Sequence, residues 1–277
     1  MTEHETPELP TELARRIQLV RRDMGQLLFH FTRAPTDKWI RVEHDHGGVS
    51  HMSASASSVL RKILYDGTLL GTSRWTYGYN TVCFTEAPIY EFNYVFALIE
   101  LASSKQERPR YEPYGIAVPK KWLFQQGGRP AIYDDPDAFR FYPKDLQYRF
   151  VPYDPSKGID YTWEREWRIQ TDALRLDPKH TLVVVPSSEE AFNLVYEMAD
   201  MEADYDDESG APTGAFHVAK WLAVSLDLFG FTPHGPSPDD KYKDLWGQFK
   251  AGTITGEQLA ERIARELSQD EEGRSGS

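Results

Sequence analysis

The segment 163–168 carries the residues best suited to chemistry, because it reads Trp-Glu-Arg-Glu-Trp-Arg. In a β-strand, period-two alternation would place Glu164, Glu166 and Arg168 on one face. Carboxylates held in this way can stabilise the positive charge that develops when a glycosidic bond breaks through an oxocarbenium-like state. A solvated strand face with a local salt bridge, which is common and weakly stabilising, explains the same pattern.

A second polar pair interrupts the apolar run 27–32, Leu-Leu-Phe-His-Phe-Thr, which has β-strand character. His30 and Thr32 are two residues apart, so a strand would carry both side chains on one face. Taken alone, the pattern favours a half-exposed strand with a histidine whose hydrogen bonds are satisfied inside the fold. We expect any chemistry to lie where this strand meets the segment around Glu166.

The segment 73–80, Ser-Arg-Trp-Thr-Tyr-Gly-Tyr-Asn, combines aromatic side chains with a glycine just before a run of strand-forming residues. Rings on such a loop, Tyr77 and Tyr79 among them, suit stacking against a flat group such as nicotinamide or a nucleobase. Ordinary packing of a long loop explains these aromatic residues equally well.

Three histidines and an aspartate gather in 44–51, at His44, Asp45, His46 and His51. They are competent metal ligands, but their spacing matches no zinc motif, so we interpret the segment as a solvated loop and predict no metal site. The sequence also has no phosphate-binding P-loop, no dinucleotide-binding glycine fingerprint, no nucleophile elbow and no H-E-x-x-H helix. These absences argue against most NTPases, Rossmann oxidoreductases, α/β-hydrolases and zinc proteases.

Composition narrows the class of protein further. The 277 residues carry a formal net charge of -12, which argues against a basic surface for nucleic acid over the whole molecule. Cys83 is the single cysteine, so neither an internal disulfide nor a four-cysteine zinc site can form. No apolar stretch of about 18 residues occurs, and 1–10 lacks the apolar core of a signal peptide. We therefore expect a cytoplasmic protein with no membrane partner.

Apolar spacing and capping signals predict the order of the elements. Helices are expected over 11–24, 59–64, 87–102, 120–126 and 189–201, with another after the capping pair Thr255 and Gln258. Strands are expected over 27–32, 81–84, 114–118, 131–133, 163–169 and 181–185. We expect 34–56 to be irregular and 202–210 to be an acidic loop, and the type of 221–229 stays open.

These elements predict an α+β fold in two parts. A core over 11–186 contains the sheet, and a mostly helical C-terminal extension covers 187–272, with a soft boundary near residue 187. We expect the last residues, 273–277, to be an appended tail outside the fold.

Several segments, taken in order between residues 27 and 170, resemble the AbiGi family of abortive-infection (phage-resistance) proteins. The matching pieces are LFHFT at 28–32, the helix running into Asp-Gly at 60–67, VCFTEAP at 82–88, YGIAV at 114–118, Lys121-Trp122, 130–133, and EREWR at 164–168. The same order is more distantly similar to the DarT-like ADP-ribosyltransferases. That group splits NAD at the nicotinamide–ribose bond and transfers ADP-ribose, in known cases to nucleic acid.

The resemblance implies a split mixed/antiparallel β-sheet core with flanking helices, as in ADP-ribosyltransferases, and roles for individual residues. Glu166 would be the catalytic carboxylate and Glu164 its partner. His30 would bond a ribose hydroxyl of NAD, the backbone around Phe31 would hold the nicotinamide amide, and Thr32 would support that turn. The candidate for stacking on nicotinamide would be Tyr77, Tyr79 or Tyr90. The candidate for meeting the NAD phosphates would be Arg33 or Arg74.

The preferred hypothesis is therefore an NAD-cleaving ADP-ribosyltransferase of phage defence, with a nucleic-acid or protein acceptor and a cognate toxin or antitoxin protein as partner. Two alternatives stay open. The first is a non-enzymatic antitoxin or sensor that keeps the fold, which the net charge of -12 favours because an acidic surface can pair with a basic protein. The second is a metal-dependent nuclease that uses Glu164, Glu166 and histidines.

Overall fold

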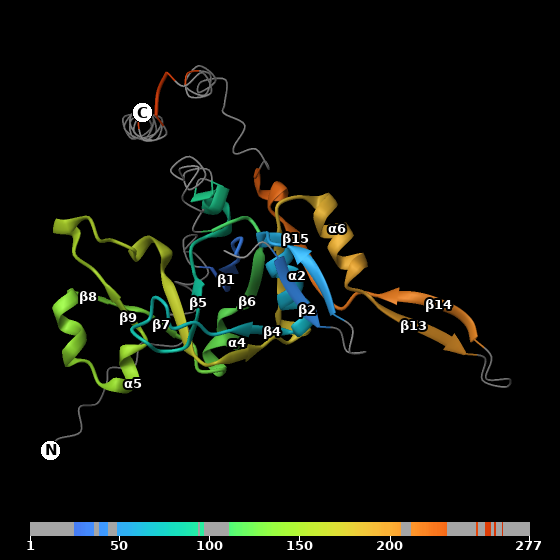
Figure 1. The fold of residues 1–277 in the computed structure, drawn as a ribbon, viewed down its shortest axis with the longest axis horizontal. Coiled ribbons are helices and arrows are strands. Elements are labelled where there is room, and N and C mark those ends of the chain that lie inside the picture. Colours follow the sequence, from blue (N-terminus) through green and yellow to red (C-terminus); the bar gives the residue numbers. More distant parts are fainter. Residues whose placement is uncertain are drawn as a thin grey trace, which may run out of the picture. The chain divides into compact units, whose positions relative to one another are not determined.

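Figure 1 shows the fold in a computed structural model of the chain. The structure describes residues 25–35, 39–43, 49–93, 95–96, 111–205 and 212–231, and single positions beyond them at 248, 253–255, 258 and 262. Within these residues the fold is α+β, with a mixed multi-stranded sheet and few helices. The predicted fold class is confirmed at this level.

The chain forms two compact units that are interleaved in sequence. Unit 1 consists of Met1–Phe29, Gly71–Pro88 and Val118–Asp172, and unit 2 consists of His30–Leu70, Ile89–Ala117 and Ala173–Ser277. The chain passes from one unit to the other inside two strands, β1 (Leu27–Phe31) and β6 (Gly115–Pro119).

Unit 1 is built on an antiparallel pair, β5 (Thr81–Thr85) and β10 (Glu166–Gln170). Both strands are rich in β-branched and aromatic residues, which pack well on a pleated surface, and Val82, Phe84 and Ile169 are buried. The other elements of unit 1 are β7 (Arg129–Pro130), which pairs with β10, the parallel pair β8 (Ile132–Asp134) and β9 (Phe150–Pro152), and the short helices α4 (Lys120–Gln125) and α5 (Lys144–Gln147).

Unit 2 contains the mixed part of the sheet. Its central strand, β12 (Leu182–Val185), pairs antiparallel with β6 and parallel with β15 (Leu222–Ser225). The run Leu-Val-Val-Val suits a strand that is covered on both faces, and its three valines are fully buried. Gly115 in β6 has no space for a side chain, because a Cβ there would lie 2.3 Å from the carbonyl oxygen of His30.

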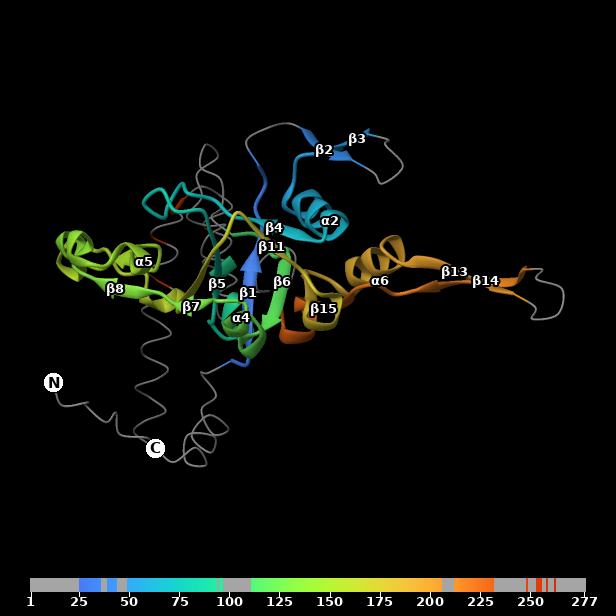
Figure 2. The ribbon, with the colours of Figure 1, turned by 90° about the horizontal axis from the view of Figure 1, so that it is seen from below.

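Helix α2 (Ala56–Asp66) confirms the helix predicted over 59–64 and shows why it begins and ends where it does. Ser55 caps its N-terminus by accepting a hydrogen bond from the backbone N–H of Ser58. Gly67 ends it in the left-handed conformation, with φ 60°. Leu60 and Leu64 share the buried face. The helix is drawn beside β4 (Thr68–Leu70) in Figure 2.

The remaining elements of unit 2 include two hairpins and a helix that packs on β12 and β15. These elements are β2 (Trp39–Glu43) with β3 (Val49–Ser53), β13 (Asp200–Tyr205) with β14 (Pro212–Val218), β11 (Ala173–Arg175), which pairs with β4, and α6 (Ser188–Glu197). The β13–β14 hairpin extends beyond the end of α6 in both ribbon views (Figures 1 and 2).

Two predictions about irregular segments are wrong. The segment 34–56 contains the β2–β3 hairpin and the first residue of α2, and the predicted acidic loop 202–210 begins as part of strand β13. In β13 the residues Asp-Met-Glu-Ala-Asp-Tyr alternate polar and apolar, which is the side-chain period of a β-strand. The acidic composition concealed this alternation.

Other predictions have mixed outcomes. The helix predicted over 11–24, most of that over 87–102, and the loop 206–210 lie outside the described residues. In the described stretch 187–231, three strands accompany α6, so this part of the predicted extension is not mostly helical. The capping pair is confirmed, because Thr255 and Gln258 exchange side chain to backbone hydrogen bonds of 3.0 and 3.2 Å. None of the helices among the described residues has the length and apolarity that a membrane span requires.

Candidate functional site

Glu166 is the first residue of β10, and its carboxylate is held by Arg168 two residues along the same strand. Arg168 Nε donates to Glu166 Oε1 at 3.0 Å, and its Nη2 donates to Oε2 at 2.9 Å. This is a two-pronged charge-assisted contact, with exposed fractions of 9% for Glu166 and 5% for Arg168. The predicted placement of both side chains on one strand face is confirmed.

Arg168 is fixed in turn by the backbone of a neighbouring segment. Its Nη1 donates to the carbonyl oxygens of Tyr148 at 3.1 Å and Phe150 at 2.8 Å. Burial lowers the pKa of Arg168, but the adjoining Glu166 carboxylate more than offsets this, so the pKa lies above its usual value. The guanidinium therefore stays charged and keeps the Glu166 carboxylate in one orientation.

Glu164 is not on the strand, so the predicted row of three side chains is wrong in this respect. It ends a short 3-10 turn, Thr162–Glu164, and Arg165 follows in the left-handed region with φ 44°. That backbone conformation breaks the period-two alternation before β10 begins. The side chain of Glu164 is nonetheless buried, with an exposed fraction of 4%.

The backbone between the two carboxylates is anchored to the end of β5. Thr85 Oγ1 donates to the carbonyl oxygen of Glu164 at 2.5 Å. The backbone N–H of Glu86 donates to the carbonyl oxygen of Arg165 at 3.3 Å. Glu86 is itself buried, forms an ion pair with Lys120 and accepts a 2.8 Å hydrogen bond from Trp167 Nε1. The start of β10 is thus tied down on both sides of Glu166.

Tyr133 and Cys83 adjoin Glu166; both lie in segments that carry the resemblance, but neither was assigned a role from the sequence. The hydroxyl of Tyr133 accepts a 2.8 Å hydrogen bond from the backbone N–H of Glu166, and burial raises the pKa of Tyr133 to about 12. Cys83 pairs with Arg168 across the sheet, and burial together with the Glu166 carboxylate raises the pKa of its thiol well above the usual range. No local sequence signal marks these neighbours, because strand pairing and loop packing bring them together.

Two of the predicted aromatic residues belong to the same unit as Glu166. The ring of Tyr77 stacks on Phe139 at 4.1 Å, lies 5.7 Å from the ring of Phe150, and has an exposed fraction of 47%. The hydroxyl of Tyr79 donates to Gln147 Oε1 at 2.8 Å. Both tyrosines therefore contact 147–150, the segment whose carbonyl groups hold Arg168.

The predicted residues 30–33 and Tyr90 lie in unit 2. Thr32 is buried, and its hydroxyl lies within hydrogen-bonding distance of the carbonyl oxygens of Ala56, at 2.9 Å, and Tyr114, at 3.0 Å. Phe31 is buried, His30 is half-buried, and Arg33 and Tyr90 are exposed. Thr32 thus secures the end of β1 to α2 and β6, and the roles of these five residues toward NAD stay predictions.

Two further segments were considered from the sequence: Arg74 as a candidate for the NAD phosphates, and 44–51, which was interpreted as a solvated loop. Arg74 is exposed, and its guanidinium lies 5.3 Å from the ring centre of Trp75. Of the predicted loop cluster, His44, Asp45 and His46 are outside the described residues. Among the residues that are described, no group of three His, Cys, Asp or Glu side chains is arranged to hold a metal ion. The metal-dependent nuclease stays an untested alternative.

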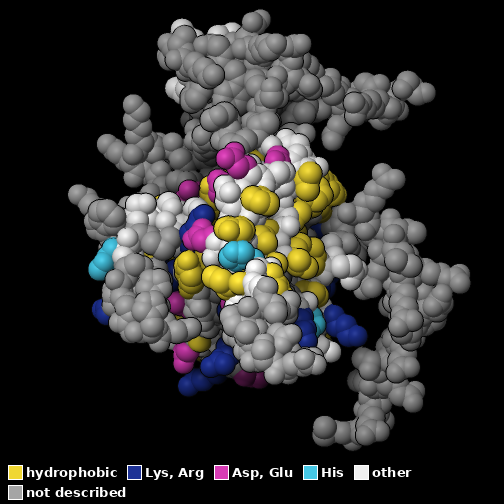
Figure 3. Space-filling model, turned by 90° about the vertical axis from the view of Figure 1, so that its right-hand side faces the viewer, with side chains coloured by type: hydrophobic (Ala, Val, Ile, Leu, Met, Phe, Trp, Pro, Cys, Tyr) yellow, Lys and Arg dark blue, Asp and Glu magenta, His cyan; other side chains and the backbone are white. Residues whose placement is uncertain are grey.

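A separate feature of unit 2 is its exposed apolar surface. Phe192 and Tyr196 on α6 and Met201 and Phe216 on the β13–β14 hairpin have exposed fractions of 73, 58, 72 and 44%. Figure 3 shows hydrophobic side chains gathered on the face that these elements present. Large apolar patches are unusual on monomeric soluble proteins and often mark contact surfaces.

Comparison of the chain with protein-family models, with curated proteins and with solved structures finds no match. The chemistry available in unit 1 is nevertheless well defined. Two buried carboxylates flank a single residue, one of them is fixed by a guanidinium, and an exposed ring lies on the adjoining segment. Such a centre suits stabilisation of a developing positive charge on a substrate that stacks on an aromatic ring.

Proposed function

We propose that the chain cleaves NAD at the nicotinamide–ribose bond and transfers ADP-ribose to a macromolecular acceptor. The observation that carries this proposal is the pair of buried carboxylates, Glu164 and Glu166, held around Arg165 at the start of β10. Arg168 holds both oxygens of the Glu166 carboxylate in one orientation, so this carboxylate offers a fixed attraction to a positive charge that develops beside it. In a buried site that attraction is stronger than in water.

Backbone strain supports the same location. Within the described residues, the only non-glycine positions with positive φ are Tyr77, at 53°, and Arg165, at 44°. Each such position carries a conformational cost, and strained residues cluster at active sites and ligand clamps. Arg165 separates the two carboxylates, and Tyr77 presents the exposed ring on the neighbouring loop.

The mechanism follows from these positions. Nicotinamide would stack on Tyr77 and leave with the electron pair of the bond to the ribose C1′ carbon. Glu166, unable to turn away from Arg168, would stabilise the oxocarbenium-like ribose that remains. An acceptor nucleophile would then bond to C1′ and release its proton, for which Glu164 is the base in this proposal.

The direct test is turnover of NAD by the purified chain. We expect a thermal shift on titration with NAD, and release of nicotinamide that increases when DNA, RNA or cell extract supplies the acceptor. Glu166→Gln should lower the rate roughly a hundredfold or more, because it removes the charge that the transition state requires. Nicotinamide release that is unchanged in Glu166→Gln would exclude the proposed role of this carboxylate.

A matched control separates catalysis from folding. Glu166→Gln is nearly isosteric, and from the sequence we would expect its melting temperature to stay within a few degrees of the wild type. The ion pair alters that expectation, because the buried guanidinium of Arg168 loses its partner at a cost of about 3 kcal/mol, or roughly 6–12 °C. Glu86→Gln breaks another buried pair in the same unit, with Lys120. It should lose comparable stability but retain far more nicotinamide release than Glu166→Gln, because Glu86 supports the start of β10 and carries no charge at the reacting bond.

A second candidate function is non-catalytic binding of a basic protein, which the exposed apolar surface of α6 and the β13–β14 hairpin favours. Glu197, Asp200 and Glu202 are exposed on the same elements, so the surface is acidic as well as apolar. This function predicts that a co-purifying basic protein is lost when Phe192 and Met201 are both changed to Asp. Absence of both NAD binding and nicotinamide release in the wild type would leave this candidate as the better one.

A further inference from the structure

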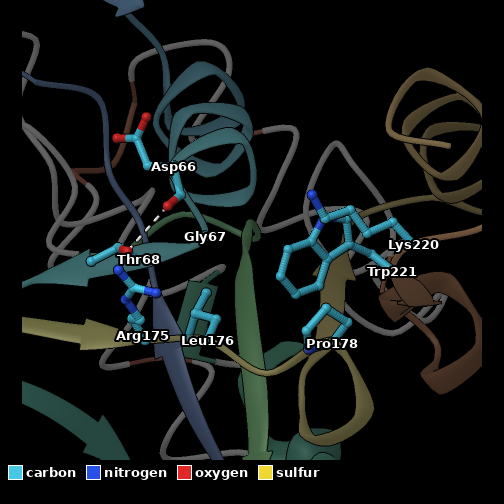
Figure 4. Close-up of a pocket in the computed structure, with 8 residues that line it drawn as sticks. All are labelled: Asp66, Gly67, Thr68, Arg175, Leu176, Pro178, Lys220 and Trp221. Atoms are coloured by element: carbon cyan, nitrogen blue, oxygen red, sulfur yellow. Dashed lines mark hydrogen bonds between the residues drawn. The ribbon is translucent and has the colours of Figure 1, made fainter. Parts of the chain in front are cut away.

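Unit 2 contains a cavity of about 340 Å³ that lies apart from the carboxylates in sequence and belongs to no role assigned above. Its lining comes from three segments. These are Asp66, Gly67 and Thr68 at the end of α2 and just beyond it; Arg175, the last residue of β11, with Leu176 and Pro178 after it; and Lys220 and Trp221 before β15. Figure 4 shows Asp66, Thr68 and Arg175 on one side and Pro178, Lys220 and Trp221 on the other. The volume lies within the range of small-molecule sites.

Positively charged side chains outnumber negatively charged ones in the lining of this cavity. Asp66, its single carboxylate, already forms an ion pair with Lys62 at 2.5 Å. Arg175 and Lys220 are exposed, and neither makes an ion pair with any residue that the structure describes. Two positive charges without a counterion therefore border the same hollow.

One of the residues that line the cavity, Trp221, also carries a buried hydrogen-bond donor. Trp221 has an exposed fraction of 1%, and its Nε1–H finds no acceptor in the described part of the chain. A buried donor without an acceptor is unfavourable, and guanidinium, ammonium and indole N–H groups have no acceptor capacity of their own. The polar side chains that lack partners here are thus all donors.

We infer that this cavity binds a small phosphate-bearing molecule. A phosphomonoester carries a charge near −2 at neutral pH and only acceptor oxygens at its three terminal positions, which matches a lining whose two cations lack counterions and whose unpartnered polar side chains are all donors. The cavity has a volume of about 340 Å³. A phosphate group fills only part of it, which leaves space for an organic body against Leu176 and Pro178. The inference is independent of the proposed NAD chemistry in unit 1.

Inorganic phosphate, AMP and adenosine are suitable probes, and calorimetric titration of the full chain at low salt is the measurement. We expect saturable binding of AMP or inorganic phosphate with a dissociation constant below about 10 mM, weakening as salt is added, and no binding of adenosine. Tighter binding of AMP would identify the ligand as a phosphate ester, and tighter binding of inorganic phosphate would identify it as free phosphate. Absence of binding by both, or binding of adenosine as tight as that of AMP, would overturn the inference.

Variants locate the binding in the cavity. Arg175→Gln and Lys220→Gln change exposed side chains, so both should fold normally, and each should weaken the phosphate probe roughly tenfold to a hundredfold. Lys179→Gln removes the same charge from an exposed lysine of the turn Pro178–His180 that does not line the cavity, and it should bind within about twofold of the wild type. Equal binding by Arg175→Gln, Lys220→Gln and Lys179→Gln would place the ligand elsewhere and refute the site.

Discussion

Cys83 reports on the charge of the candidate site because it lies beside the Glu166–Arg168 pair. Burial and the Glu166 carboxylate raise the pKa of the thiol, and the thiolate is the form that reacts with alkylating reagents. We therefore expect the native chain to react with iodoacetamide at about pH 8 far more slowly than the chain unfolded in guanidinium chloride. Intact-mass spectrometry reads the result without ambiguity, since the chain has a single cysteine.

The charge contribution can be separated from burial by the same two variants that test catalysis. Glu166→Gln removes the nearby negative charge and should speed alkylation of Cys83. Glu86→Gln should not speed it, because the Glu86 carboxylate is not among the groups that shift the pKa of the thiol. Equal alkylation rates in the wild type and in Glu166→Gln would show that burial alone protects the thiol.

Single residues of the site were predictable from sequence only where local periodicity determined them. Alternation placed Glu166 and Arg168 together, because both lie within one strand. It failed for Glu164, because the left-handed conformation of Arg165 is a local exception that residue type does not announce. The proximity of Tyr133 and Cys83 to Glu166 could not be predicted, because it arises from contacts between segments far apart in the sequence.

At the scale of elements, the C-terminus of α2 offers a clean test of backbone conformation. Gly67 has φ 60°, and a Cβ built there would have no heavy atom within 4 Å, so substitution changes backbone strain and not packing. Gly67→Ala should cost about 1 kcal/mol, or roughly 2–4 °C in melting temperature. Gly67→Asn should cost less, because asparagine tolerates the left-handed region.

Ser55→Ala provides the matching test at the N-terminus of the same helix. It removes the acceptor of the Ser58 N–H bond and should cost about 1 kcal/mol. Urea denaturation measures all three variants on one scale. Equal losses for Gly67→Ala and Gly67→Asn would contradict the account of Gly67 as a left-handed helix cap.

Elements were predictable where one signal dominated. The β-branched run of β12 and the apolar spacing and Asp-Gly end of α2 indicated the correct structures. The β13 strand was missed because its acidic residues favour a loop by composition, although their alternation with Met201, Ala203 and Tyr205 favours a strand. Pairing with β14, which no local window contains, stabilises the strand.

For the whole molecule, composition and contacts divide the chain differently. The predicted boundary near residue 187 follows a change in residue character along the sequence. The two compact units instead consist of three segments each, and the chain passes from one unit to the other inside β1 and β6. Local composition cannot indicate such an interleaved arrangement, because it arises from pairing between strands that are distant in sequence, such as β5 with β10.

The tyrosines provide a test of stability that involves the whole molecule. Five of them have a raised pKa in the folded chain: Tyr65, Tyr77, Tyr114, Tyr133 and Tyr142. Burial is the main cause for the first four, and a hydrogen bond to Asp134 is the main cause for Tyr142. The folded state thus prefers their neutral form. The resulting stability is fully present below the unfolded pKa of about 10 and is lost as pH rises through the folded values, about 12 for Tyr133. The melting temperature should therefore fall as the pH rises from about 10 towards 12.

The control for this prediction is the titration of the chain unfolded in guanidinium chloride. There the phenolate absorbance of all 15 tyrosines should rise together near pH 10. In the native chain a fraction should ionise only at higher pH, or abruptly when alkaline unfolding exposes it. Tyr133→Phe should remove part of the lagging fraction. Native and unfolded curves that coincide would show that the fold does not favour the neutral tyrosines, and the alkaline loss of stability would then need another cause.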